Sequence, residues 1–356
     1  MNAQQDQLPF HEIGEYPSEY SSTNVVSRMI EGLGYRFYWS TESLNEDDLN
    51  YKPSQVVVST GAKQSIANIA MVLLNPGDEV LLPAPYWVSY SAIATLAEAK
   101  STIIPSSIET DFKITPDQLE AAITPKTKLI MFNSPNNPSG TIYTESEYRA
   151  LGKVLEKYPD IYILSDEIYE HINYGTPHFS IAAIPELYDR TITVNGVAKA
   201  FAMTGWRIGY IGAPEFIAKA CTKIQGQVTS GANSIAQRAT IAAVEADPKV
   251  LNYMVEAFHK RRDLVVGLIK EIPGLKINVP EGAFYVFPDV SSYFGKTLNG
   301  TKIENATDFS MYLLAEANVA TVTGEAFGNP DCIRFSYATS EELLTEAMRR
   351  IKQALA

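Results

Sequence analysis

Short apolar runs alternate with amphipathic stretches from residue 56 to residue 212. The runs are rich in valine and isoleucine, which is typical of buried strands. Between them, apolar side chains recur every three or four positions, as at Ile66, Ile69 and Leu73, and this spacing predicts helices. The predicted strands cover residues 56–58, 79–83, 100–105, 128–132, 161–165, 191–194 and 208–212.

This regular exchange of strand and helix predicts an α/β fold. Its sheet should be parallel or mostly parallel, with helices on both faces. Ligands bind to such sheets at the edge where the strands end. Side chains that directly follow the predicted strands are therefore the first candidates for a functional site.

The pattern changes after Pro214. Helices are predicted first, and from Leu275 strand-like and helical segments alternate again, which predicts a smaller α+β C-terminal domain. The basic run 260–263 is predicted to lie on a solvated helix face. The predicted helices are 215–227, 233–246, 250–272, 305–317 and 340–355, and the predicted strands are 276–279, 283–287, 319–322 and 332–337.

We predict three regions along the chain. An N-terminal segment, 1–50, contains one weakly indicated helix over 23–32. A large domain follows over 51–250, and a small domain over 251–356, with the boundary drawn where the pattern changes.

Composition and charge narrow the class of protein. The chain has 356 residues, of which 46% are hydrophobic and 20% charged, as in ordinary globular proteins. A net charge of −12 argues against nucleic acid or an anionic membrane as a partner. Cys221 and Cys332 lack metal-ligand spacing and suit buried thiols of a reducing, cytoplasmic compartment. We expect neither a signal peptide nor a membrane span.

Lys199 is the first chemical candidate. It lies in a short connection between the predicted strands 191–194 and 208–212, among apolar neighbours such as Val197. Apolar surroundings disfavour an ammonium ion, so the pKa of Lys199 should fall and its amine should become nucleophilic. Arg207 follows in the same connection. A nucleophilic lysine and an anchoring arginine suit an aldehyde cofactor that carries a phosphate.

Three further candidates lie in turns that follow predicted strands. The small-residue turn Gly61-Ala62-Lys63 leads into a helix, whose free N–H groups suit a phosphate. Trp87 offers a flat face to a planar ring, and Asn137 can donate its amide to a ligand oxygen. Each of these signals taken alone also fits a structural role.

Charged residues on apolar strands complete the candidates. Asp166 follows the strand 161–165, and a carboxylate there needs a cation or an N–H partner, such as a pyridinium nitrogen. Tyr169 can point its hydroxyl the same way. Arg334 lies in the middle of the strand 332–337 and needs an anion. A substrate carboxylate and an ion pair with a nearby Asp or Glu both satisfy that need.

Seven pieces of the sequence together resemble the class I aminotransferases of fold type I, and especially bacterial aspartate aminotransferases. They occur in the order of that family over about residues 52–356. The pieces are STGAKQ (59–64), PYWVSY (85–90), NSPNNPSG (133–140), SDEIY (165–169), NGVAKAFAMTGWR (195–207), GAFY (282–285) and RFSYA (334–338).

The resemblance implies pyridoxal 5′-phosphate, held as a Schiff base on Lys199. It assigns catalytic roles to Lys199, Asp166 and Tyr169, with Asp166 at the ring nitrogen and Tyr169 at the ring hydroxyl. It implies that Arg207 is the charged partner of the phosphate and that Arg334 binds the α-carboxylate of the substrate. The remaining implied contacts are backbone groups of Gly61, Ala62 and Lys63 at the phosphate, and Trp87 and Asn137 at the ring and the substrate.

The resemblance also implies a fold, an activity and partners. The fold would be a large domain with a mostly parallel sheet of the seven-stranded type, plus a smaller C-terminal domain. The activity would be transfer of an amino group between an L-amino acid, with aspartate the first expectation, and a 2-oxo acid such as 2-oxoglutarate, in amino acid metabolism. The chain would form a homodimer.

The segment before Tyr51 departs from the family. A Gly-Glu-Pro-Asp-Phe-like run and a tyrosine segment that reaches the neighbouring subunit's phosphate are not recognisable there. Tyr35 and Tyr38 are candidates for that tyrosine. Arg28 and Arg36 are the only cations of this segment that could meet a distal carboxylate, so we expect weaker or broader distal selectivity.

Two alternatives stay open on the sequence alone. A β-elimination lyase acting on C–S bonds shares the fold and the lysine. A protein of the same fold with reduced activity would follow from the atypical N-terminal segment.

Overall fold

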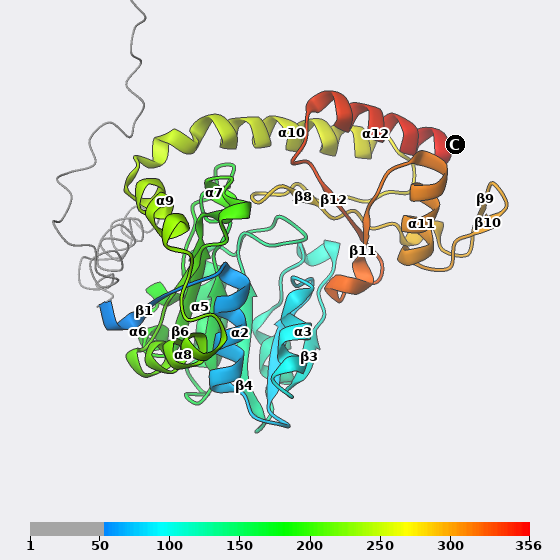
Figure 1. Cartoon of the computed structure of the whole chain (residues 1–356). Coiled ribbons are helices and arrows are strands. Elements are labelled where there is room, and N and C mark those ends of the chain that lie inside the picture. Colours follow the sequence, from blue (N-terminus) through cyan, green and yellow to red (C-terminus); the bar gives the residue numbers. More distant parts are fainter. Residues whose placement is uncertain (1–52) are drawn as a thin grey trace, which may run out of the picture.

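A seven-stranded sheet forms the centre of the larger part of the molecule (Figure 1). The structure is a computed structural model that describes residues 53–356. The strand order is β1-β7-β6-β5-β4-β2-β3, and only β7 runs antiparallel to its neighbours. The predicted mostly parallel sheet is therefore confirmed. The strands are β1 (Val56–Ser59), β2 (Glu79–Pro83), β3 (Lys100–Ile104), β4 (Thr127–Asn133), β5 (Tyr162–Asp166), β6 (Thr191–Gly196) and β7 (Gly209–Gly212).

Helices cover both faces of this sheet because successive strand residues point to opposite sides. Leu82 of β2 packs in the core under α2 (Ala62–Leu73), α3 (Ser89–Leu96) and α8 (Glu215–Val228). Its neighbour Leu81 packs in the opposite core, together with residues of the other layer. That layer contains α4 (Pro116–Ala122), α5 (Glu145–Leu155) and α6 (Pro185–Tyr188).

Local signals explain where helices begin. Thr115 caps α4 by accepting from the Gln118 N–H, and Pro116 occupies the first turn. The shorter helical segments are α7 (Val197–Ala200) and the 3-10 helices η1 (Pro53–Gln55), η2 (Ile108–Thr110), η3 (Ile181–Ala183), η4 (Thr204–Trp206), η5 (Pro248–Leu251), η6 (Ser291–Tyr293) and η7 (Gly324–Phe327).

The C-terminal part is built around a small antiparallel sheet in the order β11-β12-β8. In Figure 1, the long helix α10 runs along the top of the molecule and lies beside α12 over this sheet. The elements are α9 (Ser234–Glu245), α10 (Asn252–Lys270), β8 (Tyr285–Val286), the hairpin β9 (Thr297–Leu298) and β10 (Thr301–Lys302), α11 (Ala306–Ala317), β11 (Val322–Thr323), β12 (Ile333–Ser336) and α12 (Glu341–Ala354).

Two predicted strands of this part are wrong or displaced. Residues 276–279 form only an isolated bridge between Lys276 and Asp289, and the Asn278 side chain donates to Asp111. The strand predicted over 319–322 begins only at Val322. Asn318, in the left-handed conformation, ends α11, and the Val319 N–H bonds back to the helix.

The basic run 260–263 is not wholly a solvated face, as was predicted. Arg262 is buried, donates 2.7 Å hydrogen bonds to Pro280 O and to Asp263, and lies over the Tyr174 ring. Its neighbour Lys260 is exposed, as expected. The guanidinium therefore holds α10 against the loop that leads to β8.

Several predictions are not tested by the fold. The helix over 23–32, Arg28, Arg36, Tyr35 and Tyr38 lie outside the described residues. The domain boundaries at 51–250 and 251–356 stay predictions. No helix of the described part is both long and apolar enough to cross a membrane.

Candidate active site

The candidate residues meet at one edge of the large sheet. Asn133 and Asp166 are paired at the ends of the parallel strands β4 and β5. The adjacent strand β6 ends at Gly196, directly before α7, which carries Lys199. Because β7 is reversed, its beginning lies at this same edge and brings Arg207 there.

Lys199 is half-buried beside aromatic rings. Its Nζ lies 5.6 Å from the ring centroids of Tyr169 and of Phe284. Burial lowers the pKa of Lys199, Asp166 opposes the shift, and the positive charges of Arg334 and Arg207 add to it. This agrees with the expectation of a more nucleophilic amine at this position.

Asp166 is a buried carboxylate with neutral partners. The Tyr90 hydroxyl donates a 2.7 Å hydrogen bond to Oδ2, and the Ile168 N–H donates a 3.2 Å bond to Oδ1. Burial raises the pKa of Asp166 to about 6, although both hydrogen bonds work against the shift. No cation of residues 53–356 forms an ion pair with this carboxylate. The group is therefore prepared for a cationic partner that the described chain does not supply.

An anion site lies where α2 begins. Gly61 precedes the helix with φ 84°, and no side chain caps the first-turn N–H groups of Ala62 and Lys63. A Cβ on Gly61 would lie 2.3 Å from Arg207 Nη2, so the absence of a side chain lets the guanidinium approach the helix end. Free amides and a guanidinium together suit a phosphate.

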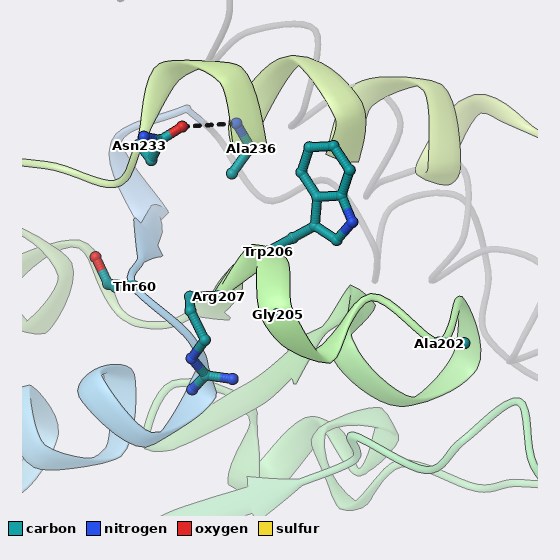
Figure 2. Close-up of a pocket in the computed structure, with 7 residues that line it drawn as sticks. All are labelled: Thr60, Ala202, Gly205, Trp206, Arg207, Asn233 and Ala236. Carbon is teal, nitrogen blue, oxygen red and sulfur yellow. Dashed lines mark hydrogen bonds between the residues drawn. The ribbon is translucent and has the colours of Figure 1, made fainter.

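Arg207 lines an open cavity of about 540 Å³. Figure 2 shows its guanidinium beside the start of α2, with Trp206 and the beginning of α9 on the other side. The Arg207 Nη1 donates to Thr204 O at 3.0 Å. Within the described chain, no carboxylate pairs with Arg207.

Trp87 lies beside Tyr90, the residue whose hydroxyl donates to Asp166. Its ring meets the Tyr90 ring edge-on at 5.5 Å, and Lys63 Nζ lies 4.9 Å from its centroid. The ring is only partly buried. Trp87 thus keeps surface available for a ligand, which a fully buried core tryptophan would not.

Arg334 and Asn137 are joined directly. Arg334 Nη1 donates to Asn137 Oδ1 at 2.9 Å, and the Asn137 N–H donates to Asn133 Oδ1 at 2.8 Å. Asn133 in turn donates to Asp166 O at 2.9 Å. The ion pair considered for Arg334 is not found among residues 53–356, so its other N–H groups can bind an added carboxylate.

Tyr169 is buried, and its hydroxyl lies 3.0 Å from the hydroxyl of Tyr285. Burial raises the pKa of Tyr169 far above the usual value for a phenol, so its hydroxyl stays protonated. It can therefore donate a hydrogen bond to a ligand oxygen.

Sequence reasoning missed three residues of this arrangement, namely Tyr90, Asn133 and Tyr285. All three occur in the pieces used to recognise the family, but they received no role. Asn133 carried a signal, because a buried strand that ends in Asn has to satisfy an amide. Tyr90 and Tyr285 carried none, because their partners are distant in the sequence.

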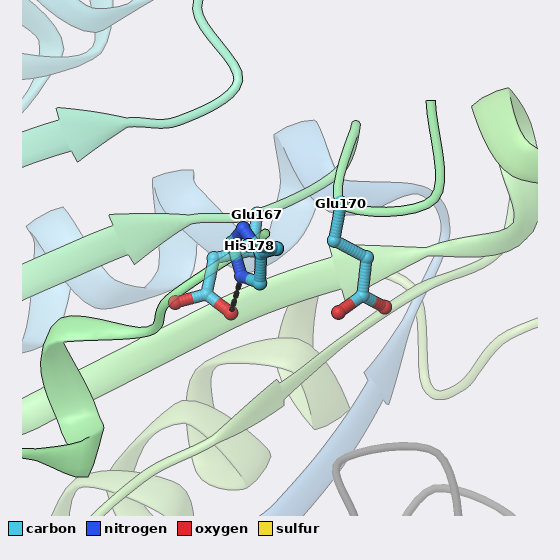
Figure 3. Close-up of side chains that lie close together, drawn as sticks. All are labelled: Glu167, Glu170 and His178. Atoms are coloured by element: carbon cyan, nitrogen blue, oxygen red, sulfur yellow. Dashed lines mark hydrogen bonds and ion pairs between the residues drawn. The ribbon is translucent and has the colours of Figure 1, made fainter. Parts of the chain in front are cut away.

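A second group of ionisable side chains lies behind the turn after β5. Glu167, Glu170 and His178 come close enough to suggest a metal site, and Figure 3 shows the contact between Glu167 and His178. Their atoms already have partners, however. Glu167 accepts from Ser165 and Ser180 and pairs with His178 at 3.1 Å. Glu170 accepts from Asn195 and pairs with His171 at 3.1 Å. Apart from the buried His178 Nδ1, which has no partner among residues 53–356, the polar atoms of the group bond to one another and to their neighbours.

The arrangement at the sheet edge fits pyridoxal 5′-phosphate. The uncapped start of α2 and Arg207 suit its phosphate, and the amine of Lys199 suits its aldehyde. The buried carboxylate of Asp166 lacks a cation, which a protonated ring nitrogen supplies. Each chemical feature of the cofactor thus has a complementary group here.

Comparisons with known proteins agree with this geometry. The family "Aminotransferase class I and II" matches residues 3–351. This match also covers most of the segment before Tyr51, in which the sequence analysis recognised no piece of the family.

Individual relatives are similar over most of the chain. A Petunia hybrida bifunctional aspartate aminotransferase and glutamate/aspartate-prephenate aminotransferase is 48% identical over 315 residues, 87% of this chain and 66% of that protein. The chain thus spans just under two thirds of the petunia protein. An aspartate/prephenate aminotransferase of Cereibacter sphaeroides is 49% identical over 86% of this chain and 78% of that protein.

The fold has a solved counterpart as well. The crystal structure of the aspartate aminotransferase from Rhizobium meliloti matches with a TM-score of 0.86 and 41% identity, over 96% of this chain and 90% of that one. The predicted fold type and the predicted dependence on pyridoxal phosphate are confirmed at the level of the family. The chain therefore belongs to the class I and II aminotransferases.

Proposed function

We propose that this chain is an aminotransferase that moves an amino group between L-aspartate and a 2-oxo acid such as 2-oxoglutarate. The observation that carries the proposal is that four ionisable side chains without an ion-pair partner among residues 53–356 meet at one edge of the sheet. They are Lys199, Asp166, Arg207 and Arg334. The names of the petunia, Cereibacter and Rhizobium proteins support aspartate as the amino donor.

The cofactor, when bound, supplies a carbonyl carbon that accepts the amino group and a ring that withdraws electrons from the substrate Cα. In our proposal, the backbone of α2's first turn and Arg207 hold its phosphate. Asp166 keeps its ring nitrogen protonated, because the carboxylate gains the cation that it otherwise lacks. The residues proposed to hold the cofactor are Gly61, Ala62, Lys63, Trp87, Asn137, Asp166, Tyr169, Lys199 and Arg207.

Lys199 has two proposed tasks, in sequence. Its Nζ would hold the aldehyde carbon of the cofactor, and the same Nζ, once released, would carry a proton. The released Nζ is neutral more readily than an ordinary lysine amine, because burial lowers its pKa. It can therefore take the proton from the substrate Cα and return it elsewhere as a general base and acid.

Arg334 is proposed to bind the substrate α-carboxylate. Its planar fork can donate to both carboxylate oxygens, and Asn137 already fixes one side of the guanidinium at 2.9 Å. Asn137 and Trp87 are proposed to line the same space. The orientation that results would present the Cα–H bond to Lys199.

The protein is proposed to be a cytoplasmic homodimer of two-domain subunits, with domains at 51–250 and 251–356. Two exposed apolar side chains support a second copy covering this face: Trp206, at 46%, lines the Arg207 cavity, and Ile235, at 71%, belongs to α9, whose Ala236 lines it. The free, buried thiols of Cys221 and Cys332 are compatible with a reducing compartment.

A panel of amino donors tests the proposed function. Purified enzyme loaded with pyridoxal phosphate is mixed with aspartate, glutamate, phenylalanine or leucine, without an acceptor. Conversion of the cofactor is followed by absorbance, and the oxo acid is quantified. We expect one oxo acid per subunit, formed fastest from aspartate.

Two results would contradict the proposal. Continuous oxo acid release from a cysteine conjugate without an acceptor would instead identify a C–S lyase. Full cofactor occupancy without any half-reaction would identify a protein with reduced activity. A marked preference for aspartate over leucine and phenylalanine would agree with the proposal. It would overturn only the separate expectation of weaker or broader distal selectivity.

A further inference from the structure

Tyr285 touches two groups of the site with different parts of its side chain. It is buried, at 6% exposure, and belongs to β8 of the small sheet. Its hydroxyl lies 3.0 Å from the hydroxyl of Tyr169, which follows strand β5 of the large sheet. Its ring centroid lies 4.6 Å from the guanidinium carbon of Arg334. One side chain thus contacts both the proposed cofactor side and the proposed substrate side.

The backbone around Tyr285 is held on both sides. In the small sheet, Tyr285 pairs with Ser336, two positions from Arg334 on β12. On the other side, the Gly282 N–H donates to Gly140 O at 2.8 Å. A Cβ on Gly140, which has φ 70°, would lie 2.6 Å from the Pro280 side chain. The loop that carries Asn137 is therefore seated directly on the segment that leads to Tyr285.

Arg334 is flanked by aromatic rings. Its guanidinium carbon lies 4.9 Å from the Phe327 ring centroid as well as 4.6 Å from that of Tyr285. Such contacts attract a cation to the ring faces without using its N–H donors. Among residues 53–356, only one of its donors is committed, to Asn137 Oδ1. The rings thereby fix the guanidinium while most of its hydrogen-bonding capacity stays available.

The hydroxyl pair has a chemical consequence for Tyr169. A phenol has a single proton to donate. If the Tyr285 hydroxyl donates to the Tyr169 oxygen, the proton of Tyr169 is free to point toward the cofactor's ring oxygen. The other ionisable groups that act on Tyr169 within residues 53–356 are Tyr90, Asp166, Arg334 and Lys199.

We propose that Tyr285 is a positioning residue with two separable roles, which rest on the proposed function. Its hydroxyl directs the proton of Tyr169 to the cofactor's ring oxygen, and its ring holds Arg334 in place for the substrate α-carboxylate. The two roles belong to different atoms, so different substitutions separate them.

Tyr285→Phe removes the hydroxyl and keeps the ring. The pH titration of the bound cofactor's absorbance should shift upward by a few tenths of a pH unit, because a weaker hydrogen bond stabilises the ionised ring oxygen less. The dissociation constant of succinate, an unreactive dicarboxylate, should stay within about twofold of the wild-type value. In a Tyr169→Phe background, Tyr285→Phe should cause no further shift, because its target is gone.

Tyr285→Leu removes the ring as well, and Tyr285→Met is the substitute if the leucine variant does not fold. The dissociation constant of succinate should then rise about 3- to 10-fold, the range expected for losing a cation–π contact. The apparent KM for aspartate should rise in parallel, with a smaller change in kcat. Phe327→Leu, on the other side of the guanidinium, should weaken succinate binding without moving the pH titration.

Specific outcomes would overturn the proposal. A merely structural Tyr285 would lower the melting temperature in both variants and leave the pH titration and succinate binding unchanged. An equal shift by Tyr285→Phe with and without Tyr169 would remove the hydroxyl role. These failures are distinct from failure of the proposed function, in which the wild-type cofactor absorbance itself would not respond to aspartate.

Discussion

The two sides of the turn that follows β5 hold their carboxylates in opposite electrostatic states. On the site side, Asp166 has a hydroxyl and an amide as partners, and burial raises its pKa to about 6. On the other side, burial would likewise raise the pKa of Glu170. There, however, His171, His178 and Asn195 lower it to about 2. The two carboxylates are close in sequence and similar in burial. They differ in that Glu170 is paired with a histidine, whereas Asp166 feels Lys199 only from beyond ion-pair distance.

This difference separates a functional group from a structural one. In the network behind the turn, both carboxylates are paired: Glu170 with His171 and Glu167 with His178, although the buried His178 Nδ1 has no partner among residues 53–356. Within the described chain, Asp166 has no ion-pair partner, at a cost to stability, and such sites are typical of functional residues. Arg334 follows the same logic with the opposite sign, because its hydrogen-bond partner is a neutral amide.

The largest effect is expected at Lys199, which is proposed to hold the cofactor and to transfer the substrate proton. Lys199→Ala should abolish the absorbance of the lysine-bound cofactor and reduce transamination by more than ~1,000-fold. The fold should persist, because the substitution removes a half-buried cation whose charged form is already disfavoured by burial. Borohydride reduction of the wild-type enzyme, followed by peptide mapping, provides the check. A reduced adduct on another lysine would refute the assignment.

Asp166→Asn should slow the half-reaction by at least ~100-fold, because the amide cannot hold the ring nitrogen's proton. Cofactor should still bind through Arg207 and Lys199. Single-turnover absorbance measurements with aspartate would detect the change. Glu170→Gln is the matched control on the other side of the turn, and its rate should change less than about threefold. Near-normal turnover of Asp166→Asn would exclude Asp166 from the mechanism.

The stabilities of the cofactor-free variants should move in opposite directions. The folded pKa of Asp166 is raised, so its contribution to stability is lost as pH rises through about 6. Asp166→Asn should therefore be more stable than the wild type by about 2–3 kcal/mol at pH 8 and nearly equal to it at pH 4.

The folded pKa of Glu170 is lowered, so its contribution is present above its unfolded pKa and is lost as pH falls toward about 2. Glu170→Gln should thus be less stable by about 1–3 kcal/mol at pH 8. Urea unfolding at both pH values measures each difference. Changes of the same sign in the two variants would break the comparison between the two sides.

The smallest effect is expected from Arg334→Lys. A lysine keeps the charge but cannot bind both carboxylate oxygens in one plane. The apparent KM should rise about 10-fold for amino and oxo acids alike, a loss of ~1.4 kcal/mol. The cofactor absorbance should stay unchanged. A change in that absorbance without a change in KM would assign Arg334 to the cofactor instead of the substrate.

Sequence patterns were sufficient for the large sheet but less so for the small one. Strands such as 128–132 are buried on both faces, and continuous apolar runs of this kind are distinctive. The short strands near 276–279 and 319–322 depend on hydrogen bonds to distant segments, and the pattern there did not reveal Asn318 as a helix end. The position of Arg262 was predicted wrongly because its hydrogen-bond partner, Pro280 O, lies outside the helix that carries it.

The sequence by itself determined the α/β class, the edge of the sheet at which chemistry occurs, and the types of residue placed there. These follow from local rules, since strand periodicity and strand ends are encoded in neighbouring residues. Only the tertiary structure decided which ionisable groups are left without an ion-pair partner among residues 53–356. Tyr90 reaches Asp166 and Tyr285 reaches Tyr169 and Arg334 only after distant segments have packed together. Burial, and with it the pKa of each group, is a property of that packing.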